Sequence, residues 1–433
     1  MRQKNLISIL WILAAHFTRA QDSSKKYTLH FQLTTVTQNH QTITAPYSGP
    51  KSLQQKEKPS TSLTATLFAG VKLFKNTELF MNPEMAGGEG MSGATGIAGF
   101  PNGETFRVGS TKPVIYLARA YLRHIIPVGS GTQWIDDAAN TIGAVMPKKY
   151  IAIYAGKLSL GDFFDDNSYS HDPREQFLNW SLMSAGAYDY AADVRGYTYS
   201  FVTEYISPDW EARVATALLP KEANGANLDW KYSKSFSWQA EVARKWNDQR
   251  SNTTVLRFIT FFNRSQMGNY KLALNYPTPD LIATRMYSRN KWGWVINAEK
   301  QLTKNSGAFS RISWNDGKNE TWCFTEIDRS ASLGYVVKGT SWHRPGDEAG
   351  LSLIANGISK DHQDFLAAGG SGFIIGDGRL NYAPELIAEL YYKLLVLEGK
   401  IAISPDYQFV LNPAYNKDRG PVHVIGVRFH TEW

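Results

Sequence analysis

Segments in which apolar and polar residues alternate recur along this chain, and they limit its fold more than any other feature. The pattern appears near the start at residues 27–34 (YTLHFQLT), again at 292–301 (WGWVINAEKQ), and at the end at 425–433 (IGVRFHTEW). Successive side chains of a β-strand point to opposite faces, so this alternation predicts strands with one apolar and one polar face. The chain is therefore expected to be all-β.

A pass along the chain predicts sixteen such strands, separated by turns and loops. They lie near 26–40, 60–74, 77–91, 114–128, 149–160, 196–207, 210–220, 235–246, 253–267, 291–303, 307–316, 330–342, 347–360, 384–398, 401–413 and 420–433. An even number of alternating strands is typical of a transmembrane antiparallel β-barrel, whose side chains face lipid and lumen in turn. A soluble sandwich turns its apolar faces inward, so alternation by itself leaves that alternative open.

The connections between these segments alternate between short and long. The short ones are rich in turn-forming residues, as at 75–77, 207–209 and 398–400. Most of the others are much longer, and the longest runs over 161–195. Short periplasmic turns and long outer loops are typical of bacterial outer-membrane barrels. The connection 129–148 is long where a short turn is due, which indicates either a periplasmic excursion or a miscounted strand.

The first 20 residues have the pattern of an export signal, with a basic start at Arg2 and Lys4, an apolar run over 6–15 and a small residue at Ala20. The run is too short for a membrane-spanning helix, which needs roughly 20 apolar residues. Without such a helix, a closed barrel is the remaining way to satisfy backbone groups in lipid. We expect a signal peptide over 1–20 and a single outer-membrane β-barrel domain over 21–433.

Charge and composition exclude several classes of function. The net charge of +7 is mild and dispersed, which argues against a nucleic-acid partner. Cys323 is the single cysteine, and no Cys/His cluster has metal-ligand spacing, so neither a metal nor a cofactor is expected. The 13 Trp and 22 Tyr are consistent with the aromatic girdles that barrels carry at both membrane interfaces.

Charged residues on the polar faces of the strands are the candidate pore-lining residues. Arg119 and Arg123 are four apart and share a face, opposite the even-numbered residues from Tyr116 to Leu122. Alternation predicts the same polar face for a further set: Lys157, Glu204, Arg213, Glu241, Glu389, Lys393, Arg428 and Glu432. Each residue alone could be an ordinary paired lumen charge, but the set as a whole indicates a water-filled lumen.

The 161–195 connection is the candidate constriction loop. It is the third outward loop in the count above, and in many porins of sixteen strands the third outer loop folds into the lumen. Its carboxylates and guanidinium groups can bond the hydroxyl groups of a small polar solute, each bond contributing a net of about 1 kcal/mol, and its aromatic rings can stack on the C–H surface of such a solute. The residues concerned are Asp162, Asp165, Asp166, His171, Asp172, Arg174, Asn179, Trp180, Tyr188, Asp189 and Arg195. The alternative is an exposed surface loop.

Several segments of the chain resemble the carbohydrate-selective porins of the OprB type. In chain order they are 102–109 (NGETFRVG), 155–167 (AGKLSLGDFFDDN), 176–180 (QFLNW), 373–382 (FIIGDGRLNY) and 412–421 (NPAYNKDRGP). The resemblance implies a barrel of about sixteen strands in the outer membrane of a Gram-negative bacterium, through which monosaccharides and small oligosaccharides diffuse. Its implied partners are small neutral sugars, outer-membrane lipid and the outer-membrane assembly machinery, with a homo-oligomer left open.

Two other functions compete with sugar diffusion. An outer-membrane barrel hydrolase would need a placed nucleophile, but the chain has no Gly-x-Ser-x-Gly motif and its histidines are scattered. The adjacent carboxylates of Asp165 and Asp166 tend to point apart rather than face each other across a sugar. An export barrel for anionic polysaccharide would need a lumen dominated by Arg and Lys, whereas acids and bases are mixed here. We therefore expect no catalytic residues and a porin rather than an enzyme.

Overall fold

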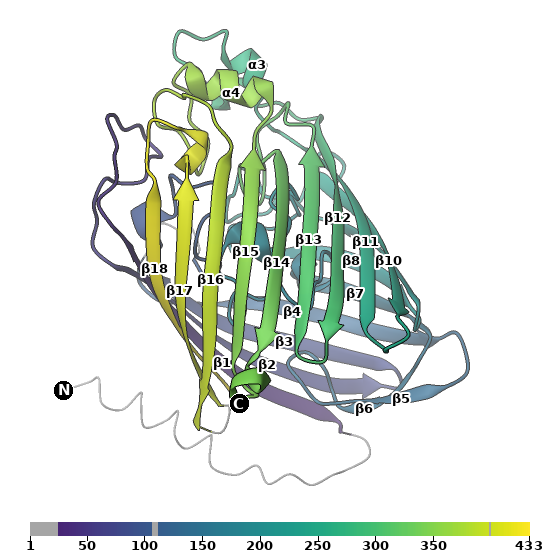
Figure 1. Cartoon of the computed structure of the whole chain (residues 1–433). Helices are drawn as coiled ribbons and strands as arrows, with labels where there is room; N and C mark the ends of the chain where they lie inside the picture. Colours follow the sequence, from purple (N-terminus) through teal and green to yellow (C-terminus); the bar gives the residue numbers. More distant parts are fainter. Residues whose placement is uncertain (1–24, 106–110, 398–399) are drawn as a thin grey trace, which may run out of the picture.

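The computed structural model describes residues 25–105, 111–397 and 400–433, and sixteen of its strands form one closed antiparallel barrel (Figure 1). The expected signal peptide lies outside the described residues. The barrel strands are β1 (Tyr27–His40), β2 (Ser60–Phe74), β3 (Thr77–Gly88), β4 (Val114–Pro127), β7 (Tyr150–Leu158), β8 (Thr198–Ile206), β9 (Trp210–Ala217), β10 (Phe236–Asn247), β11 (Thr253–Ser265), β12 (Arg289–Thr303), β13 (Ser306–Asn315), β14 (Arg329–Lys338), β15 (Glu348–Gly357), β16 (Glu385–Val396), β17 (Ile401–Leu411) and β18 (Val422–Glu432).

The first and last strands close the ring. Gln32 of β1 pairs with Glu432 of β18, and the N–H of Trp433 donates to the carbonyl of Phe31 at 2.9 Å. Each neighbouring pair is antiparallel, so the main-chain groups of the described strands are satisfied between strands, as a lipid environment requires. The predicted transmembrane barrel of sixteen strands is confirmed.

Alternation sorts side chains between the two faces of the wall as the sequence predicts. On β11, Leu256 and Phe258 are exposed on the outside, whereas Arg257 and Ile259 are buried inside. Trp292 on β12 and Trp314 on β13 meet on the outer surface with ring centroids 4.9 Å apart. Within the described residues, no helix has both the length and the apolar character needed to cross a bilayer.

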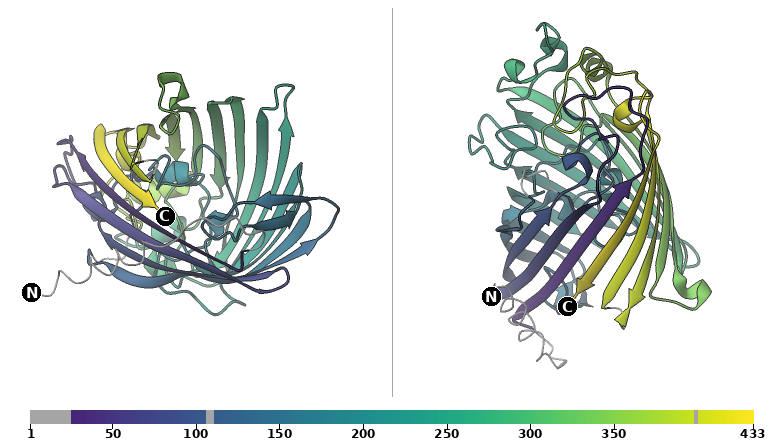
Figure 2. Two further views of the ribbon diagram at one scale, coloured as in Figure 1. Left: turned by 90° about the horizontal axis from the view of Figure 1, so that it is seen from below. Right: turned by 90° about the vertical axis from the view of Figure 1, so that its left-hand side faces the viewer.

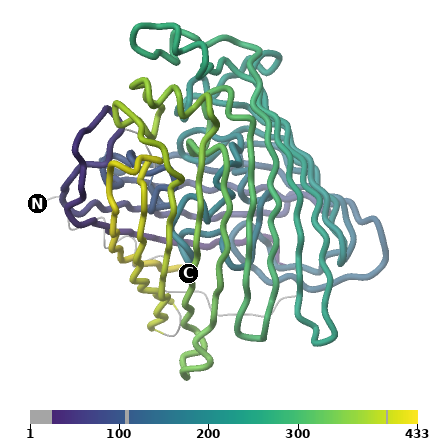
Figure 3. The backbone as a smooth tube through the Cα atoms, turned by 45° about the horizontal axis from the view of Figure 1, so that its top comes forward, coloured from purple at the N-terminus to yellow at the C-terminus, as the bar shows by residue number. Residues whose placement is uncertain are grey.

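The two ends of the barrel differ in their connections (Figure 3). One end carries the long loops, which include the short helices α3 (Tyr270–Ala273) and α4 (Lys360–Ala367). The other end carries the tight turns and the C-terminus. By the topology of bacterial barrels, the loop end is outward and the turn end is periplasmic. Seen from the turn end, chain segments occupy the space inside the ring (Figure 2).

The unexpectedly long connection 129–148 is a genuine excursion, and the strand count was right. It forms a two-stranded hairpin, β5 (Thr132–Ile135) and β6 (Ala144–Pro147), outside the barrel sheet. Because this hairpin separates them in sequence, the neighbouring barrel strands β4 and β7 are not consecutive elements. The hairpin belongs to the periplasmic end of the barrel.

Candidate functional site

The connection between β7 and β8, which contains the candidate constriction loop 161–195, folds into the barrel. Arg311 of β13 donates Nε to Asp165 of the loop at 3.0 Å. Arg428 of β18 donates to the carbonyl of Pro173 at 2.8 Å, and the carboxylate of Glu389 on β16 accepts from the backbone N–H of Asn179 at 3.1 Å. These strands lie well apart around the ring from β7 and β8, so the loop crosses the lumen.

Asp165 anchors the loop and does not line a path. Its carboxylate accepts from Asn297 at 2.6 Å, from Arg311 and from the N–H of Ala185 at 2.6 Å. Its own N–H donates to Glu241 at 2.8 Å. Asp165 is fully buried, and a buried carboxylate is tolerated only when it is paired in this way. The sequence pointed to this residue as a sugar contact, and the structure places it in the support of the loop instead.

Two glycines on the inner wall make room for aromatic residues of the loop. A side chain at Gly307 on β13 would come within about 2.0 Å of the ring of Tyr169, and one at Gly350 on β15 would come within 2.8 Å of the ring of Phe177. Such distances are below van der Waals contact, so the rings sit directly against the wall backbone. The loop is therefore packed against β13 and β15 rather than suspended in the lumen.

The water-exposed charges of the loop face basic residues of the wall. Asp162 accepts two bonds of 2.6 Å from Arg119 on β4. Asp166, whose side chain is 56% exposed, lies 3.7 Å from Arg257 on β11. A third carboxylate is 3.7 Å from a wall cation, in the pair Glu175 and Lys393. We call Asp162, Asp166 and Glu175 the loop rim; it is acidic, and the wall opposite it is basic.

A second cluster of charges and phenol rings lies where β3 and β4 face the loop. Arg174 contacts Glu104 at 3.0 Å and Glu84 at 3.2 Å. Burial raises the pKa of Glu104, an effect that the nearby Arg174 only partly offsets. Arg195 lies over the ring of Tyr116 with its guanidinium carbon 4.6 Å from the centroid. Arg174 and Arg195 thus belong to this cluster, as loop residues held against the wall.

Tyr116 lies on the lumen side, which corrects the prediction that it faces lipid. Asn82 pairs with Arg119 and Pro83 pairs with Leu117, so Ala118 is an extra residue, a β-bulge, in β4. A bulge shifts the alternation by one residue, and Tyr116 therefore points inward, where its hydroxyl donates to Glu84 at 2.5 Å. Beyond the bulge Arg119 and Arg123 keep the predicted inward face.

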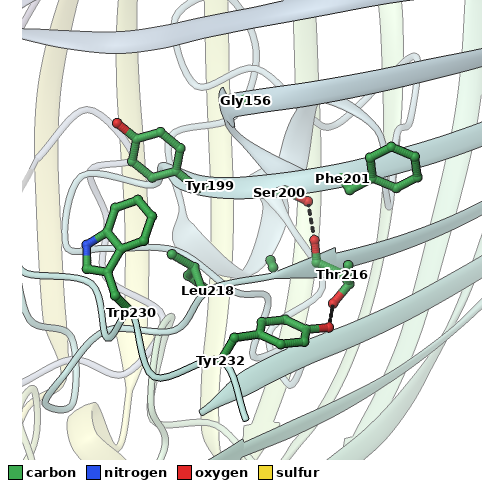
Figure 4. Close-up of a pocket in the computed structure, with 9 residues that line it drawn as sticks. Gly156, Tyr199, Ser200, Phe201, Thr216, Leu218, Trp230 and Tyr232 are labelled. Atoms are coloured by element: carbon green, nitrogen blue, oxygen red, sulfur yellow. Dashed lines mark hydrogen bonds between the residues drawn. The ribbon is translucent and has the colours of Figure 1, made fainter. Parts of the chain in front are cut away.

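Lys157 lies on the outer face of the wall, which corrects its predicted lumen position. It pairs in register with Ala120 and Tyr199, and its Nζ donates to the carbonyl of Leu117 at 2.9 Å. Close by, at the loop end of the wall, is a shallow external pocket of about 260 Å³ (Figure 4). Its lining includes Tyr199, Phe201 and Trp230, which are exposed outside the barrel. A lysine at this height can extend its ammonium toward the polar interface.

Asn179 and Trp180 are also corrected, because both are used in packing. Asn179 is fully buried and caps helix α2 (Trp180–Met183) by accepting from the N–H of Ser181. Trp180 is 7% exposed, packs against Phe100 with centroids 5.3 Å apart, and donates its indole N–H to Asn102 at 2.8 Å. Neither side chain is free to stack on or bond a sugar.

The remaining predicted wall residues form buried ion pairs or lie near the periplasmic mouth. Arg213 contacts Glu204 at 3.1 Å and Glu241 at 2.5 Å. Arg123 is paired with Glu78 on the neighbouring strand. Glu389 and Arg428 are buried against the backbone of the loop, and Glu432 is exposed at the last residue of β18. The structure thus divides the predicted set into wall supports and a smaller exposed group around the loop rim.

Sequence reasoning missed Arg257, Arg311 and Glu84, although a signal for them was present. Each occupies an inward position of a strand whose adjacent residues point outward, as Arg257 does between Leu256 and Phe258. In the described part of the chain, no group of three or more His, Cys, Asp or Glu side chains is arranged to hold a metal ion.

The model of the OprB family, described as carbohydrate-selective porin, matches residues 51–433 of the chain. The chain belongs to the OprB family of carbohydrate-selective porins. Among solved structures, OprB of Pseudomonas putida at high pH matches with a TM-score of 0.70 and 14% identity over 94% of each chain. The outer membrane channel DcaP of Acinetobacter baumannii matches with a TM-score of 0.52 and 9% identity, covering 96% of this chain and 99% of DcaP. A search of the curated proteins found no match.

Membership of the OprB family agrees with the barrel described above. The protein is an outer-membrane sugar porin of a Gram-negative bacterium, and its family and fold are those of a channel rather than of an enzyme. The structural neighbours show the fold alone, since their identity to the chain is low. The roles of individual residues in this OprB-family chain follow from its own geometry.

Proposed function

We propose that monosaccharides and small oligosaccharides diffuse passively through the barrel and that the loop 161–195 forms the constriction they must pass. The observation that carries this proposal is the loop rim. It places Asp162, Asp166 and Glu175 opposite Arg119, Arg257 and Lys393 inside the ring. A loop that crosses the lumen narrows it, and exposed charges beside the remaining space contact whatever passes.

Paired charges favour neutral hydroxyl-rich molecules over ions. A sugar exchanges its bonds to water for bonds to carboxylates and guanidinium groups, each worth a net of about 1 kcal/mol, so it is neither rejected nor held tightly. An ion loses part of its hydration in the same space and finds charges that are already neutralised by a partner. A small polar molecule without charge therefore crosses the constriction with the lowest free-energy barrier.

The same proposal includes the partners outside the lumen. The apolar outer face, with residues such as Leu333 and Leu353 half exposed, is suited to outer-membrane lipid. Handling by the outer-membrane assembly machinery is proposed from the barrel fold. A homo-oligomer remains a proposal that rests on the family alone.

Single-channel recordings in planar bilayers test the role of the loop rim. Sugar added to the bath should lower the ion current of the wild type, because a sugar in the constriction displaces ions. Asp166→Asn should weaken this block, whereas Asp364→Asn on the outer helix α4 should leave it unchanged. If sugar blocks all three proteins equally, the loop rim is not the place where sugars are bound in transit.

A further inference from the structure

The hairpin between β4 and β7 enters the barrel from the periplasmic end (Figure 2). At its tip, the side-chain Oδ1 of Asn140 accepts a bond of 2.9 Å from Nδ2 of Asn82 on β3. Asn82 is fully buried and faces the lumen, since its neighbour Met81 is exposed on the outer face. The tip therefore reaches the inner wall partway along β3 instead of remaining below the strands.

An ion pair fixes the other side of the hairpin tip. Asp137 accepts from Lys25 at 2.9 Å and lies 3.3 Å from Nε2 of His30, which faces the lumen on β1. The N–H of Gly143 donates to the same carboxylate group at 3.2 Å, which holds the two sides of the tip together. Residues 136–143, which we call the hairpin tip, thus extend along the inner wall from β1 to β3.

The inner wall beside the hairpin tip is apolar where a water-filled lumen would favour polar residues. Five inward residues of β3, β4 and β7 are nearly or fully buried: Phe80, Tyr121, Ile125, Ala152 and Tyr154. Ile142 of the hairpin tip is 1% exposed and belongs to the same buried cluster. Phe163 of the loop 161–195 contacts Tyr154 edge-on, with ring centroids 4.7 Å apart. Segments from both mouths of the barrel thus contribute apolar residues to the cluster around this wall.

The hairpin tip and the loop 161–195 come together at one pair of neighbouring wall residues. Asn82 on β3 pairs in register with Arg119 on β4. Asn82 bonds the hairpin tip, and Arg119 bonds Asp162 of the loop rim. Because paired residues on neighbouring strands are only about 5 Å apart, the hairpin tip and Asp162 of the loop rim lie close together.

We propose that the hairpin tip is the second half of the constriction and that, together with the loop rim, it determines the size of the sugar that can pass. This inference rests on the proposed sugar diffusion. It assigns a specificity-determining role to Asp137 and Asn140, which hold the tip against β1 and β3. A permeant that reaches Asp162 of the loop rim meets the hairpin tip at the same level of the lumen, so both segments limit the width of the bore.

Two variants in a Cys323→Ser background test this directly in planar bilayers. In the first, residues 136–143 are replaced by Asn-Gly, which closes a two-residue hairpin turn and keeps β5 and β6. We expect a higher single-channel conductance, and in liposomes a larger ratio of disaccharide to monosaccharide entry. In the second, Asn140→Cys is treated with a bulky water-soluble methanethiosulfonate, which should reduce the conductance. Lys304→Cys, in an exposed turn between β12 and β13, is the matched control and should not respond.

The hairpin has no part in the constriction if shortening the tip changes neither conductance nor the entry ratio, or if labelling at positions 140 and 304 has the same effect. These outcomes are separable from failure of the proposed function. If wild-type liposomes admit no sugar, sugar diffusion is wrong, whereas the ion conductances still decide whether the tip narrows the bore.

Discussion

The ion pair between Arg119 and Asp162 is a residue-scale feature with a measurable electrical consequence. Arg119→Gln leaves an unpaired carboxylate beside the bore and should make the channel more cation-selective. Asp162→Asn leaves an unpaired guanidinium group and should shift selectivity toward anions. The reversal potential in a salt gradient measures both, and the double variant should return close to the wild type. Shifts of the same sign in the two single variants would contradict the pairing.

Trp180 is the residue whose expected role changed most. Because the ring is buried against Phe100 and Phe324, Trp180→Ala should create a cavity that costs about 3–5 kcal/mol of loop packing. We expect faster proteolysis of the loop and a noisier current, with Trp180→Phe giving a milder form of both. A variant that keeps its protease resistance but loses block by sugar would show that the ring is a stacking surface after all.

Asp137 gives the hairpin tip a defined dependence on pH. Burial alone would raise the pKa of its carboxyl, but Lys25 and the N–H of Gly143 more than offset this and hold the pKa below its ordinary value. The contact is therefore fully present above the ordinary carboxyl pKa of about 3.9 and is lost as the pH falls through the lowered value.

The conductance difference between the wild type and Asp137→Asn should therefore be large above the ordinary carboxyl pKa of about 3.9 and should shrink as the pH falls below it, through the lowered pKa of Asp137. Comparing the two proteins at each pH removes the contribution of other carboxyl groups, which titrate in both. A difference that stays constant over this range would mean that the Asp137 carboxylate does not hold the tip.

Some of the candidate site follows from the sequence at this scale, and the rest does not. Arg119 and Arg123 face the lumen because alternation holds on their side of the bulge, whereas the bulge at Ala118 turned Tyr116 inward. The composition of the loop indicated groups able to bond sugars. It could not show that the side chains of Asp165 and Asn179 form their hydrogen bonds with other parts of the protein. Those bonds depend on partners more than 70 residues away in sequence.

At the scale of elements, the loop 161–195 can be shortened without loss of the fold. Pairing between strands closes the barrel, and wall residues such as Arg311 and Glu389 would face water instead of the loop. Removing residues 165–185 should therefore give a folded, heat-modifiable barrel with a higher conductance and faster entry of disaccharides. Unchanged conductance and an unchanged size limit would place the constriction elsewhere, first of all at the hairpin tip.

The barrel strands could be predicted from the sequence and the β5–β6 hairpin could not, because the barrel strands are long and the hairpin strands are short. Barrel strands of eight to fifteen residues repeat the alternation often enough to be seen, and their number came out right. Strands β5 and β6 have four residues each, and their position depends on contacts with β1 and β3 that local sequence does not encode. The length of the 129–148 connection was the only signal available.

At the scale of the whole molecule, the barrel holds segments of the chain that enter its lumen from both mouths. The barrel is fixed by backbone pairing and by the demand of lipid for satisfied hydrogen bonds. The segments inside it are fixed by ion pairs and apolar contacts with the inner wall. A rigid ring can therefore keep its shape while the inserted segments determine what passes.

Liposome swelling with a graded panel of neutral sugars tests the central claim most directly. Liposomes that contain the purified protein are placed in isosmotic monosaccharide, disaccharide and trisaccharide, and the initial swelling rate is compared with that of protein-free liposomes. Sugar diffusion through a constricted lumen predicts fast swelling in monosaccharides and a steep fall in rate with size. Swelling no faster than in protein-free liposomes, or a rate independent of sugar size, would contradict it.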